Sequence, residues 1–150
     1  MRQMAIVLLL SLVFLNGCGG SNSGPAKSDT MTGSWTATLA GTPVVRFNTT
    51  LMQNSPTDVT VTDFGFQGPV SCFTAFAGRS ATFNSTGIVN GNITGSFTFT
   101  VTTLFPGPAQ NVLVLQGSVN GPRIDGTWNR TGGATILCDS ASGTFTMTKN

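Results

Sequence analysis

This sequence contains no histidine, no glutamate and no tyrosine, and only 8 % of its 150 residues are charged. Without histidine, a Ser-His-Asp triad, a histidine-ligated metal site and an HExxH motif are all excluded. The seven basic residues are scattered and nearly balanced by five aspartates, which gives a net charge of +2. Binding a nucleic-acid backbone needs clustered Lys and Arg, so we expect no nucleic-acid partner.

The route to catalysis that these absences leave open is a pair of carboxylates, as in glycoside hydrolases. The candidates in this chain are Asp58, Asp63, Asp125 and Asp139. Asp58 and Asp139 lie beside turn residues, where aspartate commonly forms turns or caps. Asp63 and Asp125 lie on expected strands and could face either way. No D-x-D-x-D spacing supports a calcium site. We therefore expect no enzyme activity, no metal site and no cofactor.

The front of the chain has the layout of a cleavable export signal. Arg2 supplies a positive charge, an apolar run covers residues 4–15, and Leu15-Asn16-Gly17-Cys18 follows. The apolar run is shorter than the roughly 20 residues that a membrane-spanning helix needs. The last four residues of this stretch resemble the lipobox of bacterial lipoproteins. An ordinary secretory signal with a chance cysteine is the alternative.

The resemblance to bacterial lipoproteins implies a lipid anchor at Cys18. In that family the cysteine thiol is alkylated by a diacylglycerol and the chain is cut just before it, so residues 1–17 would be the signal peptide. The resulting partner would be membrane lipid of the bacterial cell envelope. Gly19 is not the aspartate that retains such proteins in the inner membrane of enteric bacteria. The resemblance therefore implies the outer membrane.

A polar segment separates the lipobox from the rest of the chain. From Gly19 to Thr30 it has almost nothing to bury, so we expect residues 18–31 to be a lipidated cysteine with a flexible linker. Treated as a Gly/Ser coil, such a linker has an end-to-end distance of about 20 Å. Residues 32–150 are then long enough for a single domain.

The other two cysteines, Cys72 and Cys138, make an even pair in an exported chain. Disulfides persist in the oxidising periplasm, so we expect a bridge between them. Two free buried thiols, or a catalytic thiol pair, are the alternatives, and the second lacks both a histidine base and C-x-x-C spacing.

From Gly33 onward apolar residues alternate with hydroxylated ones at a period of two, which indicates half-buried strands and no helix. The clearest stretch is residues 93–102, in which Phe97, Phe99 and their odd-numbered neighbours alternate with Thr or Ser. The first strand is expected to bury Trp35, and the last Phe145. We expect strands at 33–40, 44–53, 57–65, 70–77, 80–89, 92–103, 110–119, 122–130 and 141–148.

Turn signals fall between these strands. Asn90-Gly91 and Asn120-Gly121 fit two-residue hairpin turns, because Asn and Gly tolerate positive φ, and Gly78-Arg79 is expected to form a third. Short connections place consecutive strands side by side and antiparallel. The chain is therefore expected to be all-β, an antiparallel meander of eight or nine strands that closes into a small barrel. A β-sandwich is the alternative.

Glycine recurs two positions before an inward aromatic residue. The four copies are Gly33-Ser34-Trp35, Gly95-Ser96-Phe97, Gly126-Thr127-Trp128 and Gly143-Thr144-Phe145. Such a glycine leaves room beneath an aromatic ring and allows a strand to bend sharply, as a small closed barrel requires.

Three stretches resemble avidin-type barrels and, more loosely, lipocalins. They are Thr32-Gly33-Ser34-Trp35, the segment Arg123–Trp128 and the closing segment Thr144–Lys149. The resemblance implies a calycin-like barrel, with Trp128 at the place of a ligand-lining tryptophan. Ala37 and Gly41 stand where the avidin family has the Asn and Ser that contact biotin. The resemblance therefore implies the barrel and not biotin binding.

Two functions fit these expectations. A barrel with a packed interior would be a non-catalytic interaction module of the envelope or cell surface, which contacts an envelope protein through its outer face and loops. A barrel open at one mouth would carry a small apolar ligand lined by Trp35, Phe97 and Trp128. Nothing polar converges on these aromatics, and buried aromatics usually pack β cores, so we favour the interaction module.

Overall fold

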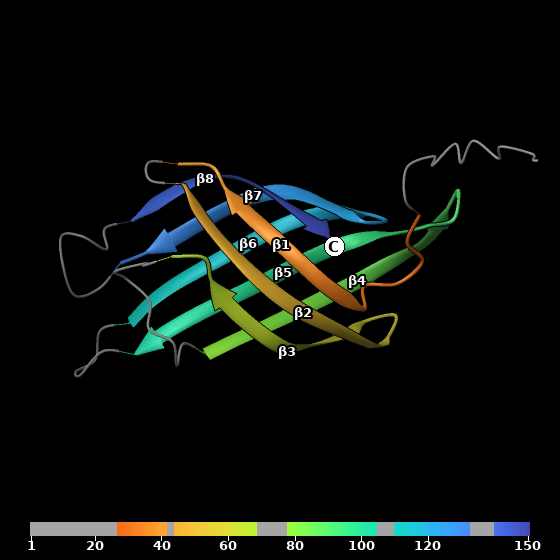
Figure 1. Cartoon of the computed structure of the whole chain (residues 1–150), viewed down its shortest axis with the longest axis horizontal. Helices are drawn as coiled ribbons and strands as arrows, with labels where there is room; N and C mark the ends of the chain where they lie inside the picture. Colours follow the sequence, from red (N-terminus) through yellow and green to blue (C-terminus); the bar gives the residue numbers. More distant parts are fainter. Residues whose placement is uncertain (1–26, 42–43, 69–77, 105–109, 133–139) are drawn as a thin grey trace, which may run out of the picture.

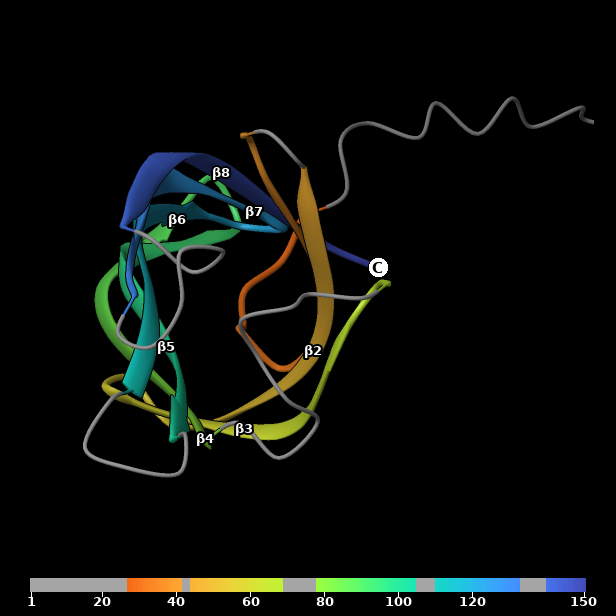
Figure 2. The ribbon, with the colours of Figure 1, turned by 90° about the vertical axis from the view of Figure 1, so that its left-hand side faces the viewer.

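The computed structural model describes residues 27–41, 44–68, 78–104, 110–132 and 140–150. These residues form eight strands and no helix, joined in one antiparallel sheet in the order β3-β2-β1-β8-β7-β6-β5-β4. The strands are β1 (Gly33–Leu39), β2 (Val45–Ser55), β3 (Asp58–Phe66), β4 (Gly78–Val89), β5 (Asn92–Leu104), β6 (Gln110–Asn120), β7 (Arg123–Thr131) and β8 (Ala141–Lys149). Figure 1 and Figure 2 show the sheet curled into a nearly closed barrel. The expected all-β meander is confirmed, and it is consistent with a calycin-like barrel.

The two ends of the barrel differ in how the strands are joined. One end, here called the hairpin end, carries the short turns β2–β3, β4–β5 and β6–β7. The opposite end, the loop end, is where the chain passes from β1 to β2, from β3 to β4, from β5 to β6 and from β7 to β8. In Figure 1 the hairpin end is on the right. The expected strand at 70–77 belongs to the β3–β4 connection and lies outside the described residues.

Of the three predicted hairpin turns, one is confirmed and two are wrong. Asn90 and Gly91 both have positive φ, 52° and 79°, as a type I′ turn requires, so the first prediction is confirmed. The second is wrong by one residue, because Asn120 pairs with Arg123 and the turn residues are Gly121 and Pro122. Gly121 supplies the positive φ of the first turn position, 57°. The prediction at 78–79 is wrong, because these residues already pair with β5 at the start of β4.

The period-two pattern correctly identified the buried face. Phe97 is 1 % exposed and Phe99 is fully buried, whereas Thr98 between them points to the outer face and is half-buried. Trp35 and Phe145 are also buried, as expected. Inward side chains of all eight strands meet in one core, which Met31 joins from the segment before β1. The core consists of Met31, Trp35, Ala37, Leu39, Phe47, Leu51, Val59, Phe83, Ile93, Phe97, Phe99, Val101, Leu113, Leu115, Val119, Ile124, Trp128, Phe145 and Met147.

Two of the four recurrent glycines, Gly95 and Gly143, lie beneath aromatic rings, and each ring belongs to a neighbouring strand. The other two do not, because an added Cβ would meet the Lys149 side chain at Gly33 and the Gln116 backbone at Gly126. The indole of Trp128 on β7 covers Gly143 on β8, where an added Cβ would lie 2.8 Å from the indole nitrogen. The ring of Phe83 on β4 covers Gly95 on β5 in the same way, with an added Cβ 2.6 Å from a ring carbon. Glycine therefore allows large rings on one strand to pack over the backbone of the next.

Candidate functional site

The two tryptophans predicted to line a ligand, Trp35 on β1 and Trp128 on β7, form hydrogen bonds to the backbone at opposite ends of β1. Trp35 is fully buried, and its indole N–H donates to the Met31 carbonyl oxygen at 2.9 Å, just before β1. Trp128 is 8 % exposed, and its indole N–H donates to the Ala40 carbonyl oxygen at 3.0 Å, just after β1. A buried indole needs such an acceptor, so both tryptophans hold β1 in place.

Phe97, the third predicted residue, belongs to a group of rings contributed by β2, β3 and β5. The members of this aromatic cluster are Phe47, Phe64, Phe66, Phe97 and Phe99. Phe99 stacks against Phe47 at 5.3 Å and against Phe64 at 5.7 Å, and its centroid lies 6.2 Å from that of Phe97. These separations are typical of packed aromatic pairs. Phe97 therefore packs against the ring of Phe99 in a cluster that contains neither tryptophan.

Two members of this cluster, Phe64 and Phe66, were not among the residues predicted from the sequence to form a site. Both rings are half-buried on β3, and they contact each other edge to face at 5.0 Å. The sequence signal was incomplete, because Phe64 and Phe66 alternate with Gly65 but are out of phase with Val59 and Val61. A register shift opposite Thr50 and Leu51 brings both pairs of side chains against the core. What the sequence did not indicate is that β3 is an edge strand and that its Phe64 ring reaches Phe99 on β5.

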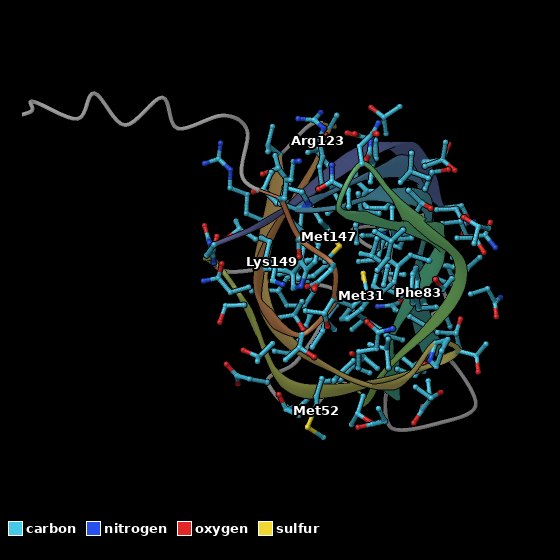
Figure 3. All side chains as sticks on the ribbon, turned by 90° about the vertical axis from the view of Figure 1, so that its right-hand side faces the viewer. Met31, Met52, Phe83, Arg123, Met147 and Lys149 are labelled. Atoms are coloured by element: carbon cyan, nitrogen blue, oxygen red, sulfur yellow. The ribbon has the colours of Figure 1, made fainter. Side chains whose placement is uncertain are left out.

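Residues 27–32, here called the N-terminal segment, pack against the hairpin end. Met31 is fully buried, and Figure 3 shows it inside the ring of strands together with Met147 and Phe83. Its backbone N–H donates to Gln53 Oε1 at 2.9 Å. These contacts attach the start of the folded domain to the inside of the barrel and to β2.

The end of the chain holds the same segment from the other side. Lys149, on β8, donates from Nζ to Ser28 Oγ at 2.9 Å and to the Thr30 carbonyl oxygen at 3.0 Å. Burial lowers the pKa of Lys149, and the nearby Asp29 carboxylate opposes that shift. Residues 28–31 were expected to belong to the flexible linker, but the structure packs them against the barrel because Met31 is a core side chain.

Two polar side chains point into the barrel near the loop end, at positions where the alternation predicts apolar residues. Thr103 on β5 pairs with Asn111 on β6, and they are 2 % and 0 % exposed. In the part of the chain that the structure describes, Thr103 Oγ1 is a buried polar atom with no hydrogen-bond partner. Such an atom costs free energy, so this position departs from ordinary core packing. Sequence reasoning overlooked it, although both residues break the apolar pattern of their strands.

The candidate carboxylates on the strands face solvent. Asp125 lies on the outer face of β7, where Arg123 donates to it from Nε at 2.5 Å and from Nη2 at 2.7 Å. The hydrogen bonds from Arg123 are the main reason that the pKa of Asp125 lies below its ordinary value of 3.8. Asp63 is exposed on β3, and Asp58 accepts a hydrogen bond from Asn54 Nδ2 at 2.8 Å. Asp139 lies outside the described residues.

The three cysteines, Cys18, Cys72 and Cys138, also lie outside the described residues. Within the described ranges, no three His, Cys, Asp or Glu side chains come together as a metal site would require. The same ranges contain no helix that is long and apolar enough to cross a membrane. No protein-family model matches the chain, and neither a curated protein nor a solved structure matches it at a significant level.

Proposed function

We propose that this protein is a lipid-anchored bacterial lipoprotein whose barrel serves as a non-catalytic interaction module of the cell envelope. The observation that carries the proposal is the fixed attachment of the N-terminal segment. Ser28 accepts a hydrogen bond from Ile93 N–H at 2.7 Å, and Met31 is fully buried. A chain anchored through Cys18 would therefore meet the domain at one defined place and present the rest of the barrel to a partner. Gly19 favours the outer membrane as the site of anchoring.

Packing of the interior favours an interaction module over a carrier. Of the side chains expected to line a ligand, Phe97 contacts the ring of Phe99, and Trp128 fills the space above Gly143. Phe47, Phe83 and Phe99 are each fully buried by protein alone. Protein interiors of this kind are close-packed, so a ligand would have to displace side chains to enter. An envelope protein that contacts the outer face needs no such rearrangement.

The anchor is tested by changing Cys18→Ala and comparing membrane fractions and intact masses with those of the unchanged protein. We expect the unchanged protein to carry acyl chains and to stay with the membrane, since each buried methylene contributes about 0.8 kcal/mol. The Cys18→Ala protein should carry none and be released or remain uncut. An N-terminus without lipid mass in the unchanged protein would disprove the anchor.

The choice between module and carrier is tested by native mass spectrometry of the protein extracted from its own membrane. A module should appear as the lipidated chain, alone or with a partner protein. A retained small apolar molecule, lost when Phe97 or Trp128 is changed to Ala, would instead support an avidin- or lipocalin-like carrier.

A further inference from the structure

The β4–β5 hairpin carries two exposed aliphatic side chains at its tip. Ile88 and Val89 are 60 % and 56 % exposed, and Asn90 and Gly91 form the turn directly after them. Figure 1 shows this hairpin, in green, reaching further than the other turns of the hairpin end. Neighbouring aliphatic side chains at a protruding tip gain free energy when an apolar surface covers them.

The first residues that the structure describes lie beside this same tip. The Lys27 side chain lies over Gly91, where an added Cβ would be 3.1 Å from Lys27 Cδ. Ser28 N–H donates to Asn92 Oδ1 at 3.1 Å, and Ser28 in turn accepts from Ile93 N–H at 2.7 Å. The residues through which an anchored chain enters the domain are therefore bound to the first residues of β5.

The length of chain between anchor and hairpin limits how far the tip can move from a membrane. Nine residues run from Gly19 to Lys27. Fully extended they span about 30 Å, and as a Gly/Ser-rich coil their mean end-to-end distance is about 16 Å. A lipid at Cys18 therefore holds the tip close to the bilayer surface. The loop end lies further away, because a strand as long as β2 measures about 36 Å.

We propose that Ile88 and Val89 insert into the bilayer that holds Cys18, so that the barrel stands on its hairpin end. This inference rests on the proposed lipid anchor. Burying aliphatic side chains in lipid is favourable. Because the anchor already holds the tip near the membrane, the second contact is intramolecular and forms at high effective concentration. Lys27, beside the tip, comes to the level of the lipid phosphates, which attract a cation.

The test uses the full lipidated chain in vesicles of phosphatidylcholine and phosphatidylglycerol with brominated acyl chains, which quench tryptophan on contact. Val89→Trp places the probe at the tip. Val44→Trp is the matched control, because Val44 is 55 % exposed against 56 % for Val89 and lies at the loop end. Emission of the unchanged protein is subtracted, since Trp35 and Trp128 are buried in the barrel. We expect brominated lipid to quench the added fluorescence of Val89→Trp and shift it to the blue, and to leave Val44→Trp unchanged.

The outcomes separate this inference from the anchor on which it rests. If the protein carries acyl chains and floats with vesicles, but Val89→Trp is not quenched, the tip does not insert and the anchor stands. Quenching of Val44→Trp instead would mean that the barrel has the opposite orientation, which also overturns the inference. If the chain carries no lipid and does not float with vesicles, the anchor fails, and the inference fails with it.

Discussion

The barrel is closed by different means at two boundaries between strands. β1 and β8 come from opposite ends of the chain, yet they pair in a regular ladder from Trp35–Lys149 to Leu39–Phe145. β3 and β4 are consecutive, yet they form the two edges of the sheet. Near the hairpin end, Ser85 N–H donates across this second boundary to the Pro56 carbonyl oxygen at 3.1 Å. Here the first boundary is called the closed seam and the second the open seam.

Beyond the Ser85–Pro56 bond, the open seam is packed by side chains, whereas a backbone ladder joins the closed seam. Phe64, on the edge strand β3, stacks on Phe99 of β5 across the barrel interior. Val59, also on β3, is 4 % exposed and belongs to the core. Aromatic packing can thus complete a barrel where the backbone ladder stops, because a ring spans more distance than a hydrogen bond.

Both edges at the open seam have features that discourage pairing with other chains. The β2–β3 register shifts between Thr50 and Leu51, and the β4–β5 register shifts between Ser85 and Gly87. Such irregularities twist an edge away from a flat template. The exposed Asp63 adds charge to the β3 edge, which further disfavours pairing with another strand.

The strands between the two edges, β2-β1-β8-β7-β6-β5, are here called the continuous wall. The largest effect is expected from the core side chains of this wall. Phe97→Ala should lower the free energy of unfolding by about 3–5 kcal/mol, because the ring is fully packed. Phe64→Ala, at the open seam, should cost about 1–2 kcal/mol, because its ring is half-buried. Thr98→Ala, on the outer face, is the control and should cost less than about 1 kcal/mol. Urea unfolding measures all three, and equal losses for Phe97→Ala and Thr98→Ala would contradict a one-sided wall.

Much of the continuous wall was predictable from the sequence, because the alternation of a strand and the residues of a hairpin turn are local features. Alternation from Ile93 to Val101 identified the buried face, and Asn90-Gly91 identified a turn, since both depend on residues that are close in sequence. The shifted turn at Gly121 has a local cause that was overlooked. Pro122 also fits a two-residue turn, because its fixed φ suits the second position.

The seams were not predictable, because they depend on which distant residues meet. The pattern of apolar residues on β3 would be the same with or without a strand paired to its second edge. The sequence therefore does not show where the backbone pairing of the sheet stops. The glycine rule was incomplete for the same reason. Gly143 is covered by Trp128 of the adjacent strand, and only the register between the two strands reveals that contact.

A second prediction compares glycines in the two regions. In the continuous wall, an added Cβ at Gly126 would lie 2.0 Å from the Gln116 carbonyl oxygen, on backbone that has little freedom to move. Gly126→Ala should therefore cost about 3 kcal/mol of unfolding free energy, the upper end of the usual range for overpacking. At the open seam, an added Cβ at Gly65 would meet nothing within 4 Å. Gly65→Ala should leave stability unchanged or raise it by up to about 1 kcal/mol.

Thermal melts of the two glycine variants provide the measurement. A Gly126→Ala protein as stable as Gly65→Ala would mean that β6 and β7 separate easily. The backbone of the continuous wall would then be packed no more closely than that of the open seam.

A third prediction concerns the cysteines in the connections that follow β3 and β7. Cys72 lies in the β3–β4 connection and Cys138 in the β7–β8 connection, both outside the described residues. The strands that flank them, β3, β4, β7 and β8, all reach the loop end. We predict a Cys72–Cys138 bridge, and its loss in the double Ser variant should cost about 2–4 kcal/mol.

Non-reducing peptide mapping should give one linked peptide pair that contains both residues. Hydrogen exchange of the double Ser variant should accelerate at β3 and β4 more than at β1 and β8. Two alkylatable thiols in the native oxidised protein would rule out the bridge.

The smallest effect is expected from charge on the outer face, and the Arg123–Asp125 pair provides the test. Their side chains are 56 % and 52 % exposed, so solvent screens the pair. Because Arg123 lowers the pKa of Asp125 in the folded protein, the pair stabilises the fold above the ordinary pKa of 3.8, and this contribution is lost as pH falls through the lowered value. Asp125→Asn should therefore be slightly less stable at neutral pH, and acid or high salt should remove the difference. Urea unfolding across this pH range measures it. A loss as large as that of Gly126→Ala would mean that surface charge, rather than close backbone packing, holds β7 against its neighbours.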